Sequence, residues 1–143
     1  SAMEGGARSA PPAPSGLRVE FRAVSFGYDP ARPVLHDLTF TAEPGQTIAL
    51  VGHTGSGKSS LINLVAKFHL PVAGGLFVDG REIRTVTSRS LHRQLGFVQQ
   101  QNFLFSGTVL DNLRLAKPGA GRDEVRAAAA RLDCLDLLEA LTP

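Results

Sequence analysis

The first recurring pattern along the chain is an alternation of apolar and polar side chains. Leu17, Val19, Phe21 and Ala23 are apolar, and charged residues stand between them. Alternation with a period of two and one polar face predicts a half-exposed antiparallel strand. A second strand is predicted from Val34 to Ala42. The fold is therefore expected to begin with antiparallel β-structure.

A mostly apolar, partly β-branched run follows at residues 47–51, after a turn at residues 43–46. Such a run predicts a strand buried on both faces. Beyond residue 60 the apolar positions recur at helical spacing as far as Pro71, and they are Leu61, Ile62, Leu64, Val65 and Phe68. The pattern therefore predicts a strand, a loop and a helix in that order.

The rest of the chain alternates short strands and helices. We expect a turn at 71–75, a strand at 76–78, a turn at Asp79 and Gly80, a helix over about 88–94 and a strand at 96–98. Thr108 is expected to cap a helix that runs to about Leu115, and Asp123 to cap the alanine-rich stretch 124–132. The mixture predicts an α/β fold in which Cys134 is a packed helix residue.

The loop between the apolar run and the helix reads GHTGSGKSS and matches the P-loop pattern G-x-x-x-x-G-K-[ST]. Glycines allow positive φ and a close approach of backbone N–H groups to an anion, and the helix start adds roughly half a positive charge. In this motif Lys58 reaches the β- and γ-phosphates, and the Ser59 hydroxyl ligates Mg²⁺. The alternative is a glycine-rich turn that binds nothing. The predicted cofactor-binding residues here are Gly52, His53, Thr54, Gly55, Ser56, Gly57, Lys58, Ser59 and Ser60, with the His53 side chain outside the phosphate cradle.

Composition limits the remaining possibilities. The chain has 143 residues, of which 43% are hydrophobic, so it can bury one modest core. Its 15 basic and 13 acidic residues form no run, which gives no support for a nucleic-acid partner. One cysteine excludes an internal disulfide, and no apolar stretch approaches the roughly 18 residues that span a bilayer. We expect a soluble chain, with residues 1–16 disordered and residues 1–3 left from an expression vector.

Three further segments carry a resemblance to a known family. They are VSFGY followed by PVLHDLTF (24–40), LHRQLGFVQQQNFLF (91–105) and FSGTVLDNL (105–113). With the P-loop, they make residues 17–143 resemble the first part of the nucleotide-binding domain of an ABC transporter, most similar to multidrug and lipid exporters. The implied fold is an α/β P-loop NTPase core lobe with an antiparallel β subdomain at its start and the beginning of a helical subdomain, in truncated form.

The resemblance assigns roles to residues outside the P-loop. Tyr28 would stack on adenine, which is worth roughly 1–3 kcal/mol, although a lone Tyr can also simply pack at a strand end. The family glutamine falls on one of Gln99, Gln100 and Gln101, and alignment on residues 95–98 selects Gln100, as a Mg²⁺ ligand or an orienter of water. The next two residues, Gln101 and Asn102, depart from the acidic residue and proline that are common in relatives.

Partners and activity also follow from the resemblance. Residues from about Gln100 to Leu113 would face the coupling helices of a transmembrane domain, and a second nucleotide-binding domain would complete the ATP site. The sequence contains no LSGGQ-like signature, no run of four apolar residues before Asp-Glu and no downstream switch histidine. We therefore expect this chain to bind Mg-ATP without hydrolysing it, whereas an intact parent at the cytoplasmic face of a membrane would couple hydrolysis to export.

Two other classes of protein stay open at this point. A stand-alone P-loop GTPase or nucleoside kinase would share the glycine loop, but the sequence lacks N-K-x-D and D-x-x-G strings and an obvious pair of acceptor-site carboxylates. A non-catalytic interaction module would keep part of the fold without binding nucleotide. Nucleotide preference and Mg-ATP binding separate these alternatives from the ATP-binding interpretation.

Overall fold

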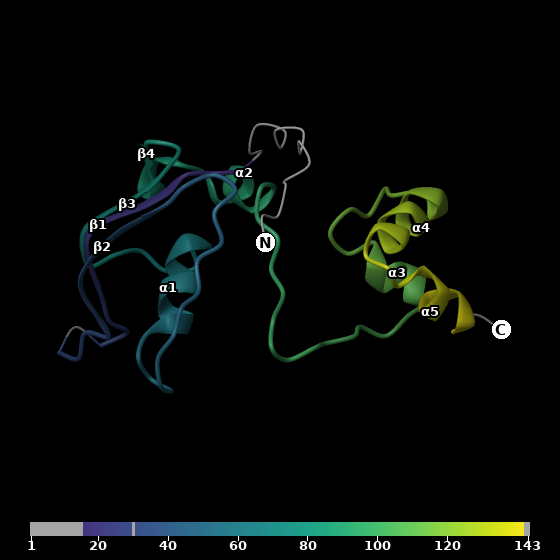
Figure 1. Ribbon diagram of the computed structural model, residues 1–143, viewed down its shortest axis with the longest axis horizontal. Helices are drawn as coiled ribbons and strands as arrows, with labels where there is room; N and C mark the ends of the chain where they lie inside the picture. The colour runs from purple at the N-terminus through teal and green to yellow at the C-terminus, as the bar shows by residue number, and fades with distance from the viewer. Residues whose placement is uncertain (1–15, 30, 142–143) are drawn as a thin grey trace, which may run out of the picture. The chain divides into compact units, whose positions relative to one another are not determined.

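The computed structural model describes residues 16–29 and 31–141. The predicted disorder of the N-terminal tail therefore lies outside the described residues, except at Gly16. The chain divides after Phe97 into two compact units (Figure 1).

The first unit is built on a four-stranded antiparallel sheet with the strand order β2-β1-β3-β4 (Figure 1). Its strands are β1 (Val19–Phe26), β2 (Leu35–Ala42), β3 (Ala73–Val78) and β4 (Arg81–Glu82). The two antiparallel strands predicted at the start of the fold are confirmed. Asp79 and Gly80 form the predicted turn between β3 and β4, and their φ values of 47° and 75° are those of a tight hairpin turn.

A bulge in β1 changes the predicted alternation. Ala23 was expected on the same face as Phe21, but Ala23 is exposed and Val24 is buried instead. Ala23 has a φ of 51°, and the register with β2 shifts between Phe21 and Val24, which moves the later side chains to the other face.

The same bulge explains why β3 starts earlier than predicted. Residues 71–75 were expected to form a turn, yet β3 begins at Ala73 and pairs there with Ser25. Gly74 has a φ of 77°, and a β-carbon at Gly74 would lie 2.1 Å from the carbonyl oxygen of Ala23. Glycine is therefore required at this point because the β1 backbone approaches so closely, and it marks a bulge within a strand rather than the end of a turn.

Helix α1 (Lys58–Val65) packs on the sheet and builds the core (Figure 1). Leu61 and Leu64 of α1 join Phe21, Val24 and Leu76 of the sheet in one buried cluster. The short helices η1 (Ile83–Thr85) and α2 (Ser88–His92) add Ile83 and Leu91 to this cluster. The predicted helices after the P-loop and near residue 88 are thus confirmed, although both are shorter than the sequence pattern indicated.

Two predicted strands are absent from the described structure. Residues 47–51 and 96–98 form no ladder with any described strand, and Val51 and Val98 are 90% and 99% exposed. Their apolar composition is typical of strands covered on both faces. Such a strand exists only where neighbouring strands satisfy its N–H and C=O groups, and these runs pair with no described strand.

The second unit contains helices α3 (Val109–Leu113), α4 (Arg122–Arg131) and α5 (Leu135–Ala140). The predicted cap of α3 is confirmed, because Thr108 and Asp111 form a reciprocal capping box. The predicted cap of α4 is wrong: Gly121 occupies the capping position, and Asp123 lies inside the first turn, where its charge favours the helix dipole. Cys134 does not lie in a helix but directly before α5, half-buried, with its Sγ 3.5 Å from the carbonyl oxygen of Ala129.

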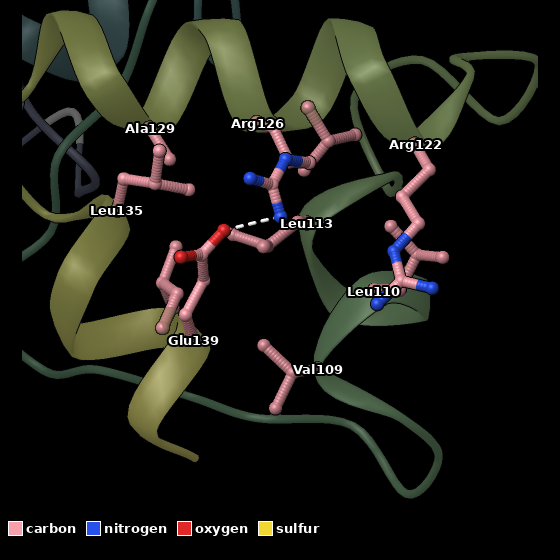
Figure 2. Close-up of a pocket in the computed structure, with 10 residues that line it drawn as sticks. Val109, Leu110, Leu113, Arg122, Arg126, Ala129, Leu135 and Glu139 are labelled. Atoms are coloured by element: carbon pink, nitrogen blue, oxygen red, sulfur yellow. Dashed lines mark ion pairs between the residues drawn. The ribbon is translucent and has the colours of Figure 1, made fainter. Parts of the chain in front are cut away.

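An apolar groove lies between these three helices. Figure 2 shows Val109 and Leu113 of α3, Ala129 of α4 and Leu135 of α5 around it. Arg126 and Glu139 form an ion pair at the groove (Figure 2). Within the described part of the chain, no helix has the length and apolar character needed to cross a bilayer.

Candidate nucleotide-binding site

The loop before α1 depends on its glycines for different physical reasons. A β-carbon at Gly52 would lie 2.5 Å from Ser56 Oγ, and one at Gly57 would lie 2.7 Å from Leu35 Cδ2. Gly55 has open space around it but a φ of 86°, and Gly57 has a φ of 91°, both in the region that side chains disfavour. A side chain is therefore excluded at Gly52 and Gly57, where its β-carbon would clash, and is disfavoured at Gly55 by the backbone conformation.

Lys58 reaches from the first residue of α1 back over this loop. Its Nζ donates hydrogen bonds to the carbonyl oxygen of Gly52, to that of His53 at 2.9 Å and to Ser56 Oγ at 3.3 Å. All three acceptors are uncharged, so the ammonium brings an unneutralised positive charge into the loop. A phosphate oxygen is a stronger acceptor for such a charge than a carbonyl oxygen.

The start of α1 is open to an anion. Gly57, at the capping position, offers no side chain to the N–H groups of the first turn, and that turn carries no acidic residue. These N–H groups and the helix dipole leave a positive end that nothing on α1 neutralises. The glycine loop, the Lys58 ammonium and the N-terminus of α1 together form a site that suits a polyphosphate.

The two predicted metal ligands, Ser59 and Gln100, belong to different units. Ser59 is exposed in the first turn of α1, where a hydroxyl suits Mg²⁺ bound to phosphates. Gln100 lies in an exposed bend of the second unit, so its role beside Ser59 stays a prediction from sequence. Among residues 16–29 and 31–141 no group of three or more His, Cys, Asp and Glu side chains could hold a metal ion.

The other predicted P-loop residues differ in exposure. His53 and Thr54 are exposed, and the contact recorded for His53 is made by its backbone carbonyl with Lys58. Ser60 is the one buried polar residue of the described chain. Its hydroxyl does not face solvent but donates a hydrogen bond to the phenol oxygen of Tyr28 over 3.4 Å.

Tyr28 therefore lies next to the P-loop helix. Its residue surface is 59% exposed, and its phenol oxygen also accepts a hydrogen bond from Asn63 Nδ2 at 3.3 Å. The sequence analysis missed Asn63 and His69, whose ring lies edge to face with that of Tyr28. The signal for Asn63 was available, since it follows Ser60 by three positions on one helix and so shares its face. Nothing in the sequence pattern indicated His69.

The sheet, the glycine loop and the lysine at the start of α1 define a P-loop nucleotide-binding protein with mixed α/β architecture. The family model described as "ABC transporter" matches residues 35–142. The chain therefore belongs to the ABC transporter family, as the resemblance in sequence implied.

Individual relatives agree with this assignment. The chain is 50% identical over 125 residues to the "Beta-(1-->2)glucan export ATP-binding/permease protein NdvA" of Rhodopseudomonas palustris (strain BisA53), covering 87% of this chain and 21% of that protein. It is 50% identical over 111 residues to the "Mycobactin import ATP-binding/permease protein IrtA" of Mycolicibacterium thermoresistibile, covering 78% of this chain and 12% of that protein. The chain thus spans about a fifth or less of the length of these relatives.

A solved structure extends the likeness to three dimensions. It is described as a bacterial Atm1-family ABC exporter with ATP bound and matches with a TM-score of 0.81 at 38% identity. The match covers 91% of this chain and 23% of that chain. The fold is therefore that of part of an ABC ATPase domain of the exporter type.

Proposed function

We propose that this chain is a Mg-ATP-binding part of an ABC exporter. The observation that carries the proposal is the placement of the Lys58 ammonium inside a glycine loop at an uncapped helix start. The backbone of residues 52–60 would hold the phosphates, Lys58 would contact the β- and γ-phosphates, and Ser59 would ligate Mg²⁺. Tyr28 would stack on adenine, and the solved relative described with ATP bound supports this choice of nucleotide.

We expect the chain alone to bind ATP without turning it over. The Gln100 side chain can orient a water molecule, but an amide cannot accept its proton at neutral pH. Loss of a general base typically costs a factor of about 10²–10⁴ in rate. The sequence also holds no LSGGQ-like segment that could stabilise the γ-phosphate of a second copy.

The longer protein would couple ATP hydrolysis to export across a membrane, with this domain on the cytoplasmic face. A second nucleotide-binding domain would complete the ATP site, and residues from about Gln100 to Leu113 would contact the coupling helices of a transmembrane domain. Export rather than import is supported by the names of NdvA and of the Atm1-family structure, whereas IrtA is named for import.

Isothermal titration of the chain with Mg-ATP tests the binding proposal. Lys58→Ala should weaken ATP binding about 10- to 100-fold, the equivalent of a lost charge-assisted hydrogen bond, and should leave adenosine binding almost unchanged. Lys117→Ala is the matched control, because it removes the same charge from a lysine that is paired with Glu124 in the second unit. An equal loss for ATP and adenosine in Lys58→Ala would refute the phosphate role.

A phosphate-release assay separates the alternatives. No turnover by the parent chain is the expected result. Turnover that disappears in Lys58→Ala would instead indicate a stand-alone P-loop enzyme with its own general base. A folded chain that gives no heat with Mg-ATP would indicate a non-catalytic interaction module.

A further inference from the structure

The phenol of Tyr28 is held by two side chains of α1. Ser60 Oγ and Asn63 Nδ2 donate hydrogen bonds to its oxygen over 3.4 and 3.3 Å, although Tyr28 is more than 30 positions away in sequence. Ser60 is only 5% exposed, so its hydroxyl depends on this partner. Both distances are at the long end of the normal range, so each bond orients the ring without fixing it rigidly.

Asn63 also links Tyr28 to a second aromatic neighbour. Its backbone carbonyl oxygen accepts a hydrogen bond from the backbone N–H of His69 at 3.4 Å, and the His69 ring meets the Tyr28 ring edge to face at 5.1 Å and 88°. The side chain of Asn63 thus contacts the phenol, while its backbone carbonyl oxygen bonds the main chain of His69. A substitution of the side chain removes the first contact and keeps the second.

The ring of Tyr28 has two aromatic neighbours, and 59% of the residue surface stays exposed. Phe26, which is 4% exposed, meets it edge to face at 5.0 Å and 80°. Neither Phe26 nor His69 lies parallel to the ring, and no other aromatic contact to Tyr28 occurs among the described residues. The exposed part of the ring, on which no described aromatic side chain is stacked in parallel, can take a planar ligand.

We propose that Ser60 and Asn63 are positioning residues that hold the Tyr28 ring ready for a stacked purine base. This inference rests on the proposed ATP-binding function. Helix α1 then serves both ends of the nucleotide: Lys58 at its first residue serves the phosphates, and Ser60 and Asn63 serve the base through Tyr28. Lys58 and Asn63 are five residues apart, about 7.5 Å along the helix axis, so one rigid element sets the separation of the two subsites.

Affinity measurements with two ligands test this role. Ser60→Ala and Asn63→Ala should each weaken ATP binding about threefold, the equivalent of one weak hydrogen bond, and Asn63→Ala, which lies outside the P-loop, should leave inorganic triphosphate unaffected. Ile62→Ala is the matched control, because Ile62 lies on the same helix, is 41% exposed and makes none of these contacts. Alanine is the best helix former, so α1 should persist in all three variants, which circular dichroism verifies.

Tyr28→Phe completes a double-mutant cycle. Tyr28→Phe keeps the ring but removes the oxygen that accepts both hydrogen bonds. It should therefore weaken ATP binding to the same extent as the double variant Ser60→Ala/Asn63→Ala. Asn63→Ala should then cause no further loss in the Tyr28→Phe background. Fully additive losses would mean that Asn63 acts independently of Tyr28 and would overturn the inference.

Tyrosine emission supplies a readout that a purely structural role would not change. The chain contains one tyrosine and no tryptophan, so its intrinsic emission comes from Tyr28 alone. ATP should quench this emission by stacking, and triphosphate should not. N-acetyltyrosinamide with the same ATP concentrations corrects for absorption of the exciting light. Asn63→Ala and Ser60→Ala should lower the quench reached at saturating ATP.

The outcomes distinguish the positioning role of Ser60 and Asn63 from ATP binding itself. If ATP quenches the parent while Asn63→Ala and Ser60→Ala keep both its affinity and its saturated quench, the positioning role is wrong and ATP binding stands. If ATP neither binds nor quenches the folded parent, the proposed function itself fails, and the positioning role fails with it.

Discussion

Gly57 and Leu35 are in such close contact that a β-carbon on Gly57 would lie 2.7 Å from Leu35 Cδ2. Leu35 is the first residue of β2, and Gly57 occupies the capping position of α1, so this contact holds the glycine loop against the sheet. Gly57 also has a φ of 91°. Two independent physical reasons therefore exclude a side chain at this position.

Gly57→Ala should destabilise the first unit more than Gly55→Ala. Gly55 shares the positive φ but has no atom near its missing β-carbon, so its variant costs only the backbone strain, about 1–2 kcal/mol. Gly57→Ala adds overpacking against Leu35, typically about 1–3 kcal/mol. Urea unfolding followed by circular dichroism measures both variants, and equal losses would show that the Leu35 contact relaxes without cost.

Tyr28→Ala should weaken the binding of purine nucleotides about tenfold, which corresponds to about 1.4 kcal/mol of lost stacking. The affinity for inorganic triphosphate should stay the same. Phe68→Ala is a suitable control, because Phe68 is also 59% exposed but contacts His92 and Phe97 instead. If Tyr28→Ala binds ATP as tightly as the parent in calorimetric titrations, Tyr28 is only a packing residue.

The local signals in the sequence were reliable where short-range chemistry decides the structure. The cap at Thr108 and the turn at Asp79 were predicted because the partners lie within a few residues. The bulge at Ala23 was not predictable, since it depends on how the β1 backbone meets Gly74 across the sheet. Residues 47–51 were predicted as a buried strand from their composition, but a strand also needs partners, which the composition of one segment cannot reveal.

The nucleotide site was predictable to a similar degree. Spacing alone located the glycine loop and Lys58, because the chemistry of that loop requires those residue types in that order. The hydrogen bonds from Ser60 and Asn63 to Tyr28 could not be predicted from spacing along the chain. They join segments that come together only when α1 packs beside the end of β1.

Thr108→Ala should loosen α3 without unfolding the first unit. Loss of a helix cap costs about 0.5–2 kcal/mol, typically about 1 kcal/mol, and 1 kcal/mol corresponds to roughly fivefold faster opening. Amide hydrogen exchange at Leu113 and Arg114, followed by NMR, measures this effect. Ser106→Ala is the control, since Ser106 is exposed in the same segment and caps no helix. Similar acceleration in both variants would argue against a special role of the capping box.

The ion pairs on β1 predict a dependence of stability on acid. Hydrogen bonds from Arg22, which has the larger effect, and from Arg18 lower the pKa of Glu20 from 4.5 to about 2. A carboxylate with a lowered pKa in the folded state contributes stability that is complete above pH 4.5 and is lost as the pH falls through about 2. Glu20→Gln should therefore unfold at a lower temperature than the parent at neutral pH, and the difference should shrink across this window.

Thermal unfolding of both proteins between neutral pH and pH 2 checks this prediction. Because Arg22 is largely exposed, the difference should be small and should diminish in high salt. Asp136→Asn serves as the control, since it removes one carboxylate from the second unit. A difference between Glu20→Gln and the parent that persists unchanged at pH 2 would show that Glu20 contributes through packing rather than through its charge.

Between residues 98 and 141, the buried side chains are those of Ala120 and Ala129. These two methyl groups, with half-buried side chains such as Leu110 and Leu138, offset only a small part of the conformational entropy that a cooperative domain of this length must lose. The helices of the second unit therefore depend on the capping box of α3 and on the ion pairs Lys117–Glu124 and Arg126–Glu139, and each helix should melt gradually. A calorimeter would then record one sharp endotherm from the first unit on a sloping baseline, with a smaller enthalpy than chain length alone implies.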